Sequence, residues 1–252
     1  MNIQWDAEKY RDDFSFVHQY GEDVLNLIKS KPGAFVVDLG CGNGALSSKL
    51  AESGYRVIGI DASEEMLKTA KALHPEITFQ RGDACSFQLK EKADVIFSNA
   101  VFHWIDEEKQ QTMIQNLADQ LVEGGELVCE FGGKGCAETV HLALERAFFR
   151  RGLKYPRTFY FPTIGTYAPI LEKAGFRVEY AVLFDRPTLQ KSADGLREWI
   201  NMFVTAPFKG ISESQKEEII QEAEKETKGK LYYDGKWYID YVRIRFRAVK
   251  EK

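Results

Sequence analysis

The sequence predicts an α/β protein built on a mostly parallel sheet of seven strands, with an antiparallel strand at its C-terminal end. Two patterns support this fold. From residue 34 to residue 184, short apolar runs alternate with runs of helical periodicity, which is typical of parallel strands joined by helices on both faces of a sheet. Residues 238–249 instead alternate apolar and polar side chains, as expected for an antiparallel strand with one wetter face.

The predicted strands are short runs of apolar and β-branched residues, bounded by glycine, proline or charged residues. The fourth run is nearly all apolar, as expected for a strand that is covered on both faces. A Tyr-Asp-Gly-Lys sequence before the last run is typical of a hairpin turn. The runs cover residues 34–39, 56–61, 77–80, 93–99, 126–131, 176–184 and 238–249.

Helices are predicted where apolar residues recur at helical spacing between these strands. Ser63 and Ser212 stand where side chains cap helix N-termini, and acidic residues at 106–108 favour the start of another helix. Gly54 and Gly175 stand where helices end. The helices cover residues 6–30, 45–53, 64–73, 106–123, 137–151 and 163–174, with two more between residues 185 and 227.

The chain of 252 residues has the size of one α/β domain. We expect residues 1–252 to form this single domain. Within it, residues 1–32 are predicted to form a helical cap, and residues 185–236 a helical lid inserted before the last strand.

Composition limits the classes of function. The chain is 44% hydrophobic and 29% charged, and its formal net charge of −4 argues against a nucleic-acid-binding surface. There is no apolar run of about 18 residues and no signal-peptide core, and the four cysteines lack C-x-x-C or metal-ligand spacing. We therefore expect a cytoplasmic protein, monomeric or dimeric, that binds neither nucleic acid nor a membrane.

The most informative sequence is VVDLGCGNG, residues 36–44, where a strand leads into a glycine-rich turn at the start of a helix. Gly40, Gly42 and Gly44 permit positive φ angles and let the backbone approach a ligand. Asp61 ends the second strand, where its two carboxylate oxygens match the two hydroxyls of a ribose. Together these features predict a site for a nucleoside with a charged tail.

Asp38 indicates which nucleoside. Its carboxylate lies two residues before the first glycine, where it would repel a pyrophosphate and attract an ammonium group. The spacing is G-x-G-x-G, whereas dinucleotide sites favour G-x-G-x-x-G. The nine-residue sequence resembles the first motif of the class I S-adenosylmethionine-dependent methyltransferases, which have a Rossmann-like fold.

This resemblance implies that the cofactor is S-adenosylmethionine, that the product is S-adenosylhomocysteine, and that no metal takes part. In the family, an acid at the position of Asp83 accepts a hydrogen bond from the adenine amino group. The residues after the fourth strand border the sulfonium, and aromatic residues of the N-terminal helix shield the methionine end. The implied cofactor-binding residues are Asp38, Gly40, Cys41, Gly42, Gly44, Asp61, Ala62, Met66, Asp83, Ala84, Asn99, Ala100, Tyr10, Phe16 and Tyr20.

The sequence SNAVFHWI, residues 98–105, closes the fourth strand. In the resembling family this loop faces both the methyl donor and its acceptor, so His103 and Trp104 are the candidate catalytic residues. His103 has a suitable ordinary pKa for a general base, and the alternative is a histidine that only satisfies a buried hydrogen bond. The loop lacks the [DN]-P-P-[YF] sequence of methyltransferases that act on DNA adenine.

Other residues are weaker candidates for the acceptor site. Trp199, Met202 and Phe203 form an apolar stripe that either walls an acceptor pocket or fills a core. The arginines at 157, 186 and 197 are possible ligands of an acidic acceptor. Residues 243–252 are interpreted as a solvated strand face and tail.

Within the family, the chain resembles the small-molecule branch that includes trans-aconitate methyltransferase. The resemblance rests on W-D-x-x-x-Y at residues 5–10, on VVDLGCGNG, on NAVFHWI, and on G-F-R-V and F-D-R-P-T between residues 175 and 188. That relative carries glutamine where this chain has His103. Its carboxylate specificity is therefore not assumed for this chain.

The predicted function is transfer of a methyl group from S-adenosylmethionine to a small-molecule acceptor, at oxygen and with a carboxylate as one candidate, by in-line displacement. A non-catalytic S-adenosylmethionine-binding module and a protein methyltransferase stay open as alternatives. An NAD-dependent dehydrogenase fits less well, because it would require a third glycine where the chain has Leu46.

Overall fold

The computed structural model describes residues 23–252, in which one sheet runs through the molecule. The strands are β1 (Phe35–Leu39), β2 (Arg56–Asp61), β3 (Thr78–Arg81), β4 (Ala93–Asn99), β5 (Leu121–Gly132), β6 (Phe176–Leu189), β7 (Tyr232–Tyr233) and β8 (Lys236–Lys250). Their order is β3-β2-β1-β4-β5-β8-β6, and β7 pairs with β8. β1 to β5 are parallel, whereas β8 is antiparallel to β5 and β6. The predicted α/β fold with an antiparallel last strand is confirmed.

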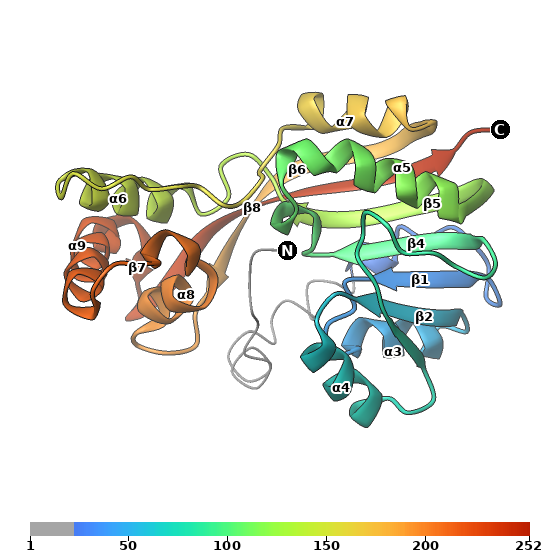
Figure 1. Ribbon diagram of the computed structural model, residues 1–252, viewed down its shortest axis with the longest axis horizontal. Helices are drawn as coiled ribbons and strands as arrows, with labels where there is room; N and C mark the ends of the chain where they lie inside the picture. The colour runs from blue at the N-terminus through green and yellow to red at the C-terminus, as the bar shows by residue number, and fades with distance from the viewer. Residues whose placement is uncertain (1–22) are drawn as a thin grey trace.

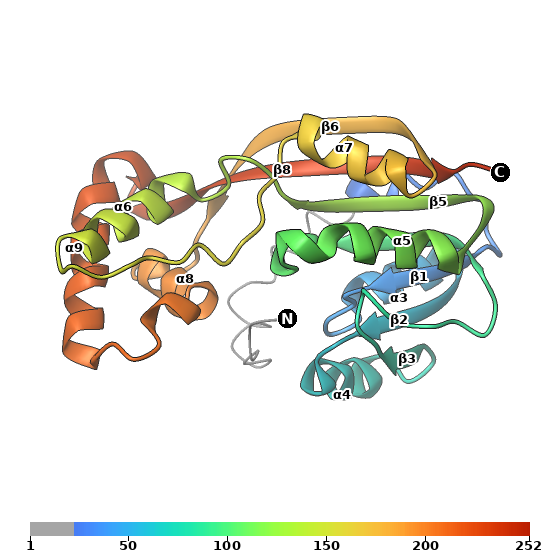
Figure 2. The same cartoon turned by 45° about the horizontal axis from the view of Figure 1, so that its top comes forward.

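Helices cover both faces of the sheet. They are α3 (Ala45–Glu52), α4 (Glu64–Leu73), α5 (Gln110–Gln120), α6 (Glu138–Phe149), α7 (Ile164–Lys173), α8 (Gly195–Phe203) and α9 (Glu213–Leu231), with short 3-10 helices η1 (Phe102–Trp104), η2 (Glu107–Lys109) and η3 (Ala206–Phe208). Figures 1 and 2 show α3 and α4 on one face and α5 and α7 on the other. The predicted caps are confirmed, since Ser63 and Ser212 accept backbone hydrogen bonds at the starts of α4 and α9.

The core forms where apolar side chains of the strands meet these helices. Val37 and Ile96 pack with Leu117 of α5 and Tyr167 of α7 in one buried cluster. The opposite face of β1 packs against α3 in a second cluster, which also includes Val24 from the N-terminal segment. The strands are thus covered on both sides, as their apolar sequences predict.

β5 begins earlier than its sequence predicts. The glycine pair at 124–125 indicates a helix end, yet α5 already ends at Gln120 and β5 starts at Leu121. Leu121 is fully buried and pairs with Ala93 of β4, with a register shift before Val95. Burial and pairing of this side chain therefore outweigh the local helical pattern, and Gly124, at φ 76°, lies in the irregular part of the strand.

A long ribbon of two strands carries a separate group of helices. β6 continues past its predicted end at residue 184, because residues 185–189 pair with the first part of β8. Figure 1 shows β8 running from the C-terminus to the helices on the other side of the molecule. We call α6, α8, α9 and β7 the helical extension. These elements share one hydrophobic cluster, in which Ala143 and Leu144 of α6 pack with Trp199 and Ile220.

Buried ion pairs join β5, β6 and β8. Both carboxylate oxygens of Glu130 are occupied: Arg186 of β6 donates two hydrogen bonds to them, and Arg245 of β8 donates another at 2.7 Å. Arg247 donates to Glu126 at 2.7 Å. The arginines are only 11–13% exposed. The prediction that this face of the last strand is solvated is therefore wrong, since β5 supplies partners at a sequence distance of more than 100 residues.

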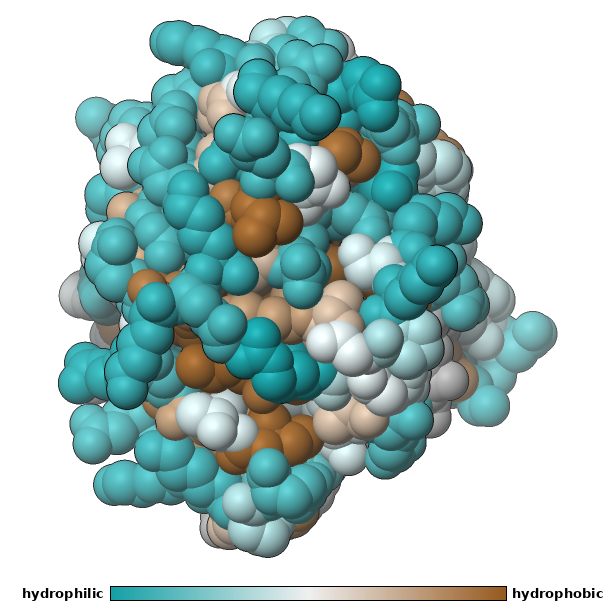
Figure 3. All heavy atoms as spheres, turned by 90° about the vertical axis from the view of Figure 1, so that its right-hand side faces the viewer, coloured by the Kyte–Doolittle hydropathy of each residue, from teal (hydrophilic) through white to brown (hydrophobic). Residues whose placement is uncertain are grey.

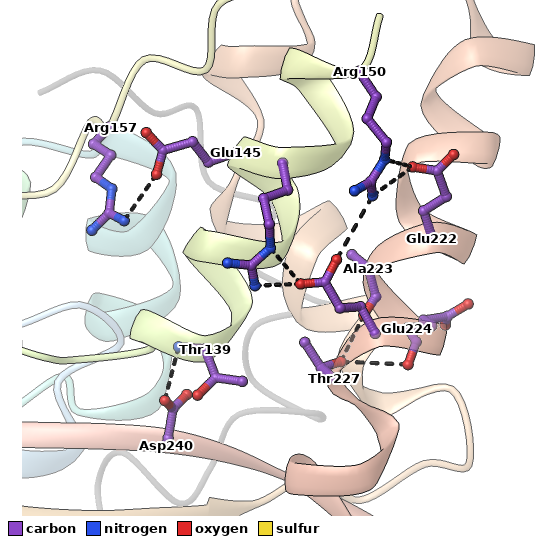
Figure 4. A network of polar contacts seen from close by, with 11 residues as sticks. Thr139, Glu145, Arg150, Arg157, Glu222, Ala223, Glu224, Thr227 and Asp240 are labelled. Atoms are coloured by element: carbon purple, nitrogen blue, oxygen red, sulfur yellow. Dashed lines mark hydrogen bonds and ion pairs between the residues drawn. The ribbon is translucent and has the colours of Figure 1, made fainter.

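Surface ion pairs connect α6 to its neighbours. Figure 4 shows Arg150, directly after α6, bonded to Glu222 of α9, and Arg157 bonded to Glu145 of α6. In the same way Arg197 pairs with glutamates of α9. The arginines at 157, 186 and 197 are thus held by carboxylates of the protein itself, and none of them lines either cavity at the candidate site.

The side of the molecule that carries the C-terminus presents mainly hydrophilic residues, with hydrophobic residues visible as smaller areas between them (Figure 3). Within residues 23–252, no helix combines the length and the apolar character that a membrane crossing requires.

Replacing Glu130 with alanine should destabilise the protein strongly, because two arginines would lose their buried counter-ion. Breaking such a pair costs about 3–5 kcal/mol. The measurement is the free energy of unfolding in urea. The matched control is Glu218→Ala, because Glu218 is 58% exposed where it pairs with Arg151 and should contribute about 1 kcal/mol or less. If the two variants lost the same free energy of unfolding, the buried ion pairs of Glu130 would contribute no more than a surface pair.

Candidate functional site

The glycine-rich loop between β1 and α3 has the backbone conformation that its sequence predicts. The φ angles of Gly40, Gly42 and Gly44 are 75°, 52° and 83°. A Cβ on Gly40 would lie 2.1 Å from Cγ2 of Val101, whereas a Cβ on Gly42 would meet nothing within 4 Å. Only glycine therefore fits at position 40, and the backbone at position 42 faces open space that a ligand can enter.

Asp61 ends β2, and its carboxylate holds this loop in place. One oxygen accepts the N–H of Gly42 at 3.0 Å, and the other accepts the N–H of Ser63 at 2.8 Å. Burial raises the pKa of Asp61, and these backbone donors oppose the rise. A carboxylate accepts about four hydrogen bonds, so Asp61 keeps further acceptor capacity for the hydroxyls of a ligand.

A cavity of about 300 Å³ opens at the carboxyl ends of β1, β2 and β4, where open α/β sheets bind ligands. We call it the larger cavity. It brings together six of the predicted site residues, from four separate segments of the chain. These residues are Gly40, Asp61, Ala62, Asp83, Ala84 and Trp104. Asp83 shapes its wall through a turn, in which its carboxylate accepts the N–H of Cys85 at 2.8 Å.

Asp38 lies beneath the loop, outside the lining of the larger cavity. Its side chain is 2% exposed and accepts a hydrogen bond of 2.6 Å from the Ser47 hydroxyl. Burial raises its pKa to about 7, the hydroxyl of Ser47 opposes the rise, and the negative charge of Asp61 adds to it. A cation bound nearby would favour the charged form of this carboxylate.

The other predicted cofactor residues lie close to the loop but do not line the larger cavity. The side chains of Cys41 and Met66 are buried, and Gly44 packs against Phe79. Asn99 is half-buried at the end of β4. Tyr10, Phe16 and Tyr20 lie outside the described residues.

Ala100, directly after β4, has a backbone conformation that alanine rarely adopts. Its φ is 63°, and its N–H donates to the carbonyl oxygen of Glu130 at 2.7 Å. A non-glycine residue in this region costs about 1–3 kcal/mol, and such residues cluster at functional sites. The strain at Ala100 turns the chain sharply into η1, which carries His103 and Trp104.

A second, smaller hollow of about 40 Å³ lies on the other side of Trp104. We call it the smaller hollow. Its walls are mostly aromatic and come from η1, the segment before α7, α8 and β8. They are formed by Ala100, His103, Trp104, Cys136, Phe159, Phe161, Trp199, Phe203, Tyr241 and Arg243. Trp104 lines both spaces.

His103 is buried, and its Nδ1 accepts the N–H of Gly132 at 3.2 Å. Burial lowers its pKa well below the ordinary value, and the nearby charge of Arg243 lowers it further. The imidazole is therefore neutral, and the bond from Gly132 leaves the proton on Nε2. This arrangement favours a hydrogen-bond donor over the general base that the sequence left open.

Part of the smaller hollow was not predicted from the sequence. Trp199 and Phe203 were candidates for an acceptor pocket, but Phe159, Phe161 and Arg243 were not. The F-x-F spacing of the two phenylalanines was a usable signal, since residues two apart point to the same side of an extended segment. Arg243 was hidden in the alternation of β8, where it looks the same as Arg245.

No group of three or more His, Cys, Asp or Glu side chains within residues 23–252 is arranged to hold a metal ion.

Gly40→Ala should lower the free energy of unfolding by more than Gly42→Ala. Both changes place alanine at a positive φ, which costs about 1–3 kcal/mol, but only Gly40 adds a collision with Val101. The comparison is made by urea unfolding of both variants without ligand. A larger loss for Gly42→Ala would show that the loop packs differently.

Asp38→Asn should remove a pH dependence from the stability of the ligand-free protein. Between the ordinary pKa of 3.8 and the folded pKa of about 7, the folded protein keeps a proton that the unfolded chain has lost. Wild-type stability therefore falls as the pH rises through this window, on the order of 4 kcal/mol for this one group.

Urea unfolding of wild type and Asp38→Asn, from pH 4 to pH 8, measures this effect. Other titrating groups cancel in the difference between the two proteins. A difference that stays constant over the whole range would show that Asp38 is ionised throughout.

Comparisons with known proteins agree with this geometry. Residues 36–125 match the family described as a methyltransferase domain. An uncharacterized methyltransferase of Schizosaccharomyces pombe is 31% identical over 259 residues, covering 98% of each chain. The matched residues 36–125 include the glycine-rich loop, Asp61, Asp83 and η1.

Solved structures share the fold at low sequence identity. A candidate methyltransferase of Bacillus halodurans superposes with a TM-score of 0.66 at 16% identity, covering 93% of this chain and 100% of that one. Magnesium protoporphyrin IX methyltransferase from Synechocystis, solved with bound S-adenosylhomocysteine, superposes with a TM-score of 0.58 at 22% identity. The superposition covers 100% of this chain and 90% of that one. The full-length relative, the domain match and the sheet order agree: this chain belongs to the class I S-adenosylmethionine-dependent methyltransferases.

Proposed function

We propose that the larger cavity binds S-adenosylmethionine and that the smaller hollow binds a small-molecule acceptor, which is methylated at oxygen. The main support for this proposal is the position of Trp104, whose side chain lines both the larger cavity and the smaller hollow. Methyl transfer requires the acceptor atom to stand in line with the bond that breaks. Two adjoining spaces of unequal size and different chemistry suit such a donor and acceptor.

The larger cavity has groups that suit each part of the donor. Asp61 has acceptor capacity for the ribose hydroxyls, and Asp83 at the cavity wall suits the adenine amino group. Beneath the loop, Asp38 lies where its charge would favour a methionine ammonium. The open space at Gly42 leaves room for the methionine backbone. Tyr10, Phe16 and Tyr20 stay predictions for the cover of this end.

S-Adenosylmethionine supplies a methyl group bound to a positive sulfur; when an acceptor oxygen bonds to that carbon, the carbon–sulfur electron pair passes to sulfur and S-adenosylhomocysteine remains. The protein's own part is positioning. The rings of Trp104 and Phe159, whose centroids are 4.7 Å apart, fix the apolar part of the acceptor. His103 donates from Nε2 rather than removing a proton.

The small-molecule assignment rests on the shape of the smaller hollow. It is small, and the aromatic rings of Trp104, Phe159 and Phe161 line it. Magnesium protoporphyrin IX methyltransferase shares the fold, and its name indicates a small-molecule substrate. We further propose that residues 1–32 form a cap and residues 185–236 a lid on one methyltransferase domain.

Asp61→Ala should lose the rise in melting temperature that S-adenosylhomocysteine gives the wild type, because the ribose hydroxyls lose their acceptor. Ligand that binds the folded state raises the melting temperature by mass action. Asp61→Asn keeps one acceptor oxygen and should retain part of the rise. Thermal unfolding with and without S-adenosylhomocysteine, and with NADH, gives the measurement.

Glu64→Gln is the matched control, because Glu64 stands near Asp61 at the start of α4 but is 69% exposed. It should keep the full rise. An unchanged rise in Asp61→Ala would remove Asp61 from the site. S-Adenosylhomocysteine binding without turnover across acids, phenols and amines would instead favour a non-catalytic module.

A further inference from the structure

Three arginines of β8 point to one face of the sheet, and two of them are neutralised. Arg245 pairs with Glu130, which stands opposite it on β5, and Arg247 pairs with Glu126. The residue opposite Arg243 is Gly132, which has no side chain to offer a carboxylate. Arg247 faces Val128 and reaches Glu126 two residues away on β5, whereas no glutamate of β5 forms an ion pair with Arg243.

Arg243 is the most deeply buried of these arginines, at 8% exposure. No ion pair joins it to any residue in the described part of the chain, and its Nε is buried without a hydrogen-bond partner. The contact that its guanidinium makes is with the ring of Tyr241, at 4.4 Å from the centroid. A buried cation without a counter-ion is unfavourable, and here it lines the smaller hollow.

A second donor faces the same hollow. The Nδ1 of His103 accepts the N–H of Gly132, so the neutral ring, which lines the hollow, carries its proton on Nε2. The lining contains no aspartate or glutamate. A cation and a neutral donor without any acid select for an anion and against a cation.

The size and the lining of the smaller hollow indicate which part of an anionic acceptor it can hold. Its volume of about 40 Å³ holds roughly three water-sized groups, the size of a carboxylate, so the body of an acceptor has to extend out of the hollow. Phe159, Trp199 and Phe203 surround this space with apolar surface. An apolar or aromatic body attached to the carboxylate would contact this apolar surface.

We propose that the acceptor is an apolar or aromatic carboxylate, and that Arg243 determines this specificity by binding the carboxylate with the help of His103. The inference rests on the proposed function, since it assigns the smaller hollow to the acceptor. An acceptor that arrives ionised also agrees with a site whose histidine is not placed to remove a proton.

The test measures binding of two probes to the protein saturated with S-adenosylhomocysteine, by calorimetry. The probes are phenylacetate and its neutral analogue phenylacetamide. Wild type should bind phenylacetate at least about tenfold more tightly, because a hydrogen-bonded charge pair contributes that much. Arg243→Met should lose this preference, and Arg243→Lys should keep part of it.

Arg157→Met is the matched control. It removes the same charge from an arginine that is 37% exposed and paired with Glu138 and Glu145, so the preference should survive. Equal binding of the two probes to wild type, or a preference that survives Arg243→Met, overturns the inference.

Binding of S-adenosylhomocysteine separates the two levels of the proposal. If wild type does not bind it, the proposed function fails. If wild type and Arg243→Met both bind it equally while wild type shows no preference for phenylacetate, only the acceptor class fails. Equal binding also shows that the variant is folded.

Discussion

The buried carboxylate of Glu130 is the contact on which the arrangement of the molecule depends. Its side chain joins β6 and β8 through Arg186 and Arg245, and its backbone carbonyl accepts the N–H of Ala100. One residue thus fixes the antiparallel ribbon and the strained turn after β4. Because the ribbon carries Arg243 and the turn leads to Trp104, the same residue sets the walls of the smaller hollow.

The two spaces have opposite electrostatic character. Asp61 and Asp83 line the larger cavity, with Asp38 beneath the loop, whereas Arg243 is the charged residue in the lining of the smaller hollow. A positively charged methyl donor suits the first and an anion suits the second. This separation agrees with the proposed transfer to a carboxylate, in which a sulfonium and a carboxylate would become a thioether and an ester.

Local patterns predicted the half of the fold that carries the glycine-rich loop. β2 and β4 have the bounds that the sequence indicates, because charged or small residues flank their apolar runs. The start of β5 and the length of β6 were not predictable in this way, since both depend on pairing with distant strands. The same limit applied to the site: Asp61 follows from a motif, but Arg243 is distinguished from Arg245 only by the glycine that faces it.

The helical extension and the glycine-rich loop are built from different parts of the chain, so the two cavities can change independently in sequence. The helical extension joins the rest of the fold through the ends of β6 and β8 and through the segments before and after α6, while the glycine-rich loop, Asp61 and Asp83 come from the first 83 residues. Substitutions in α8 or in the 159–161 segment can therefore reshape the smaller hollow without changing the residues from the first 83 positions that line the larger cavity. Acceptor specificity could then be altered in one part of the chain while the proposed donor site in the other part keeps its residues.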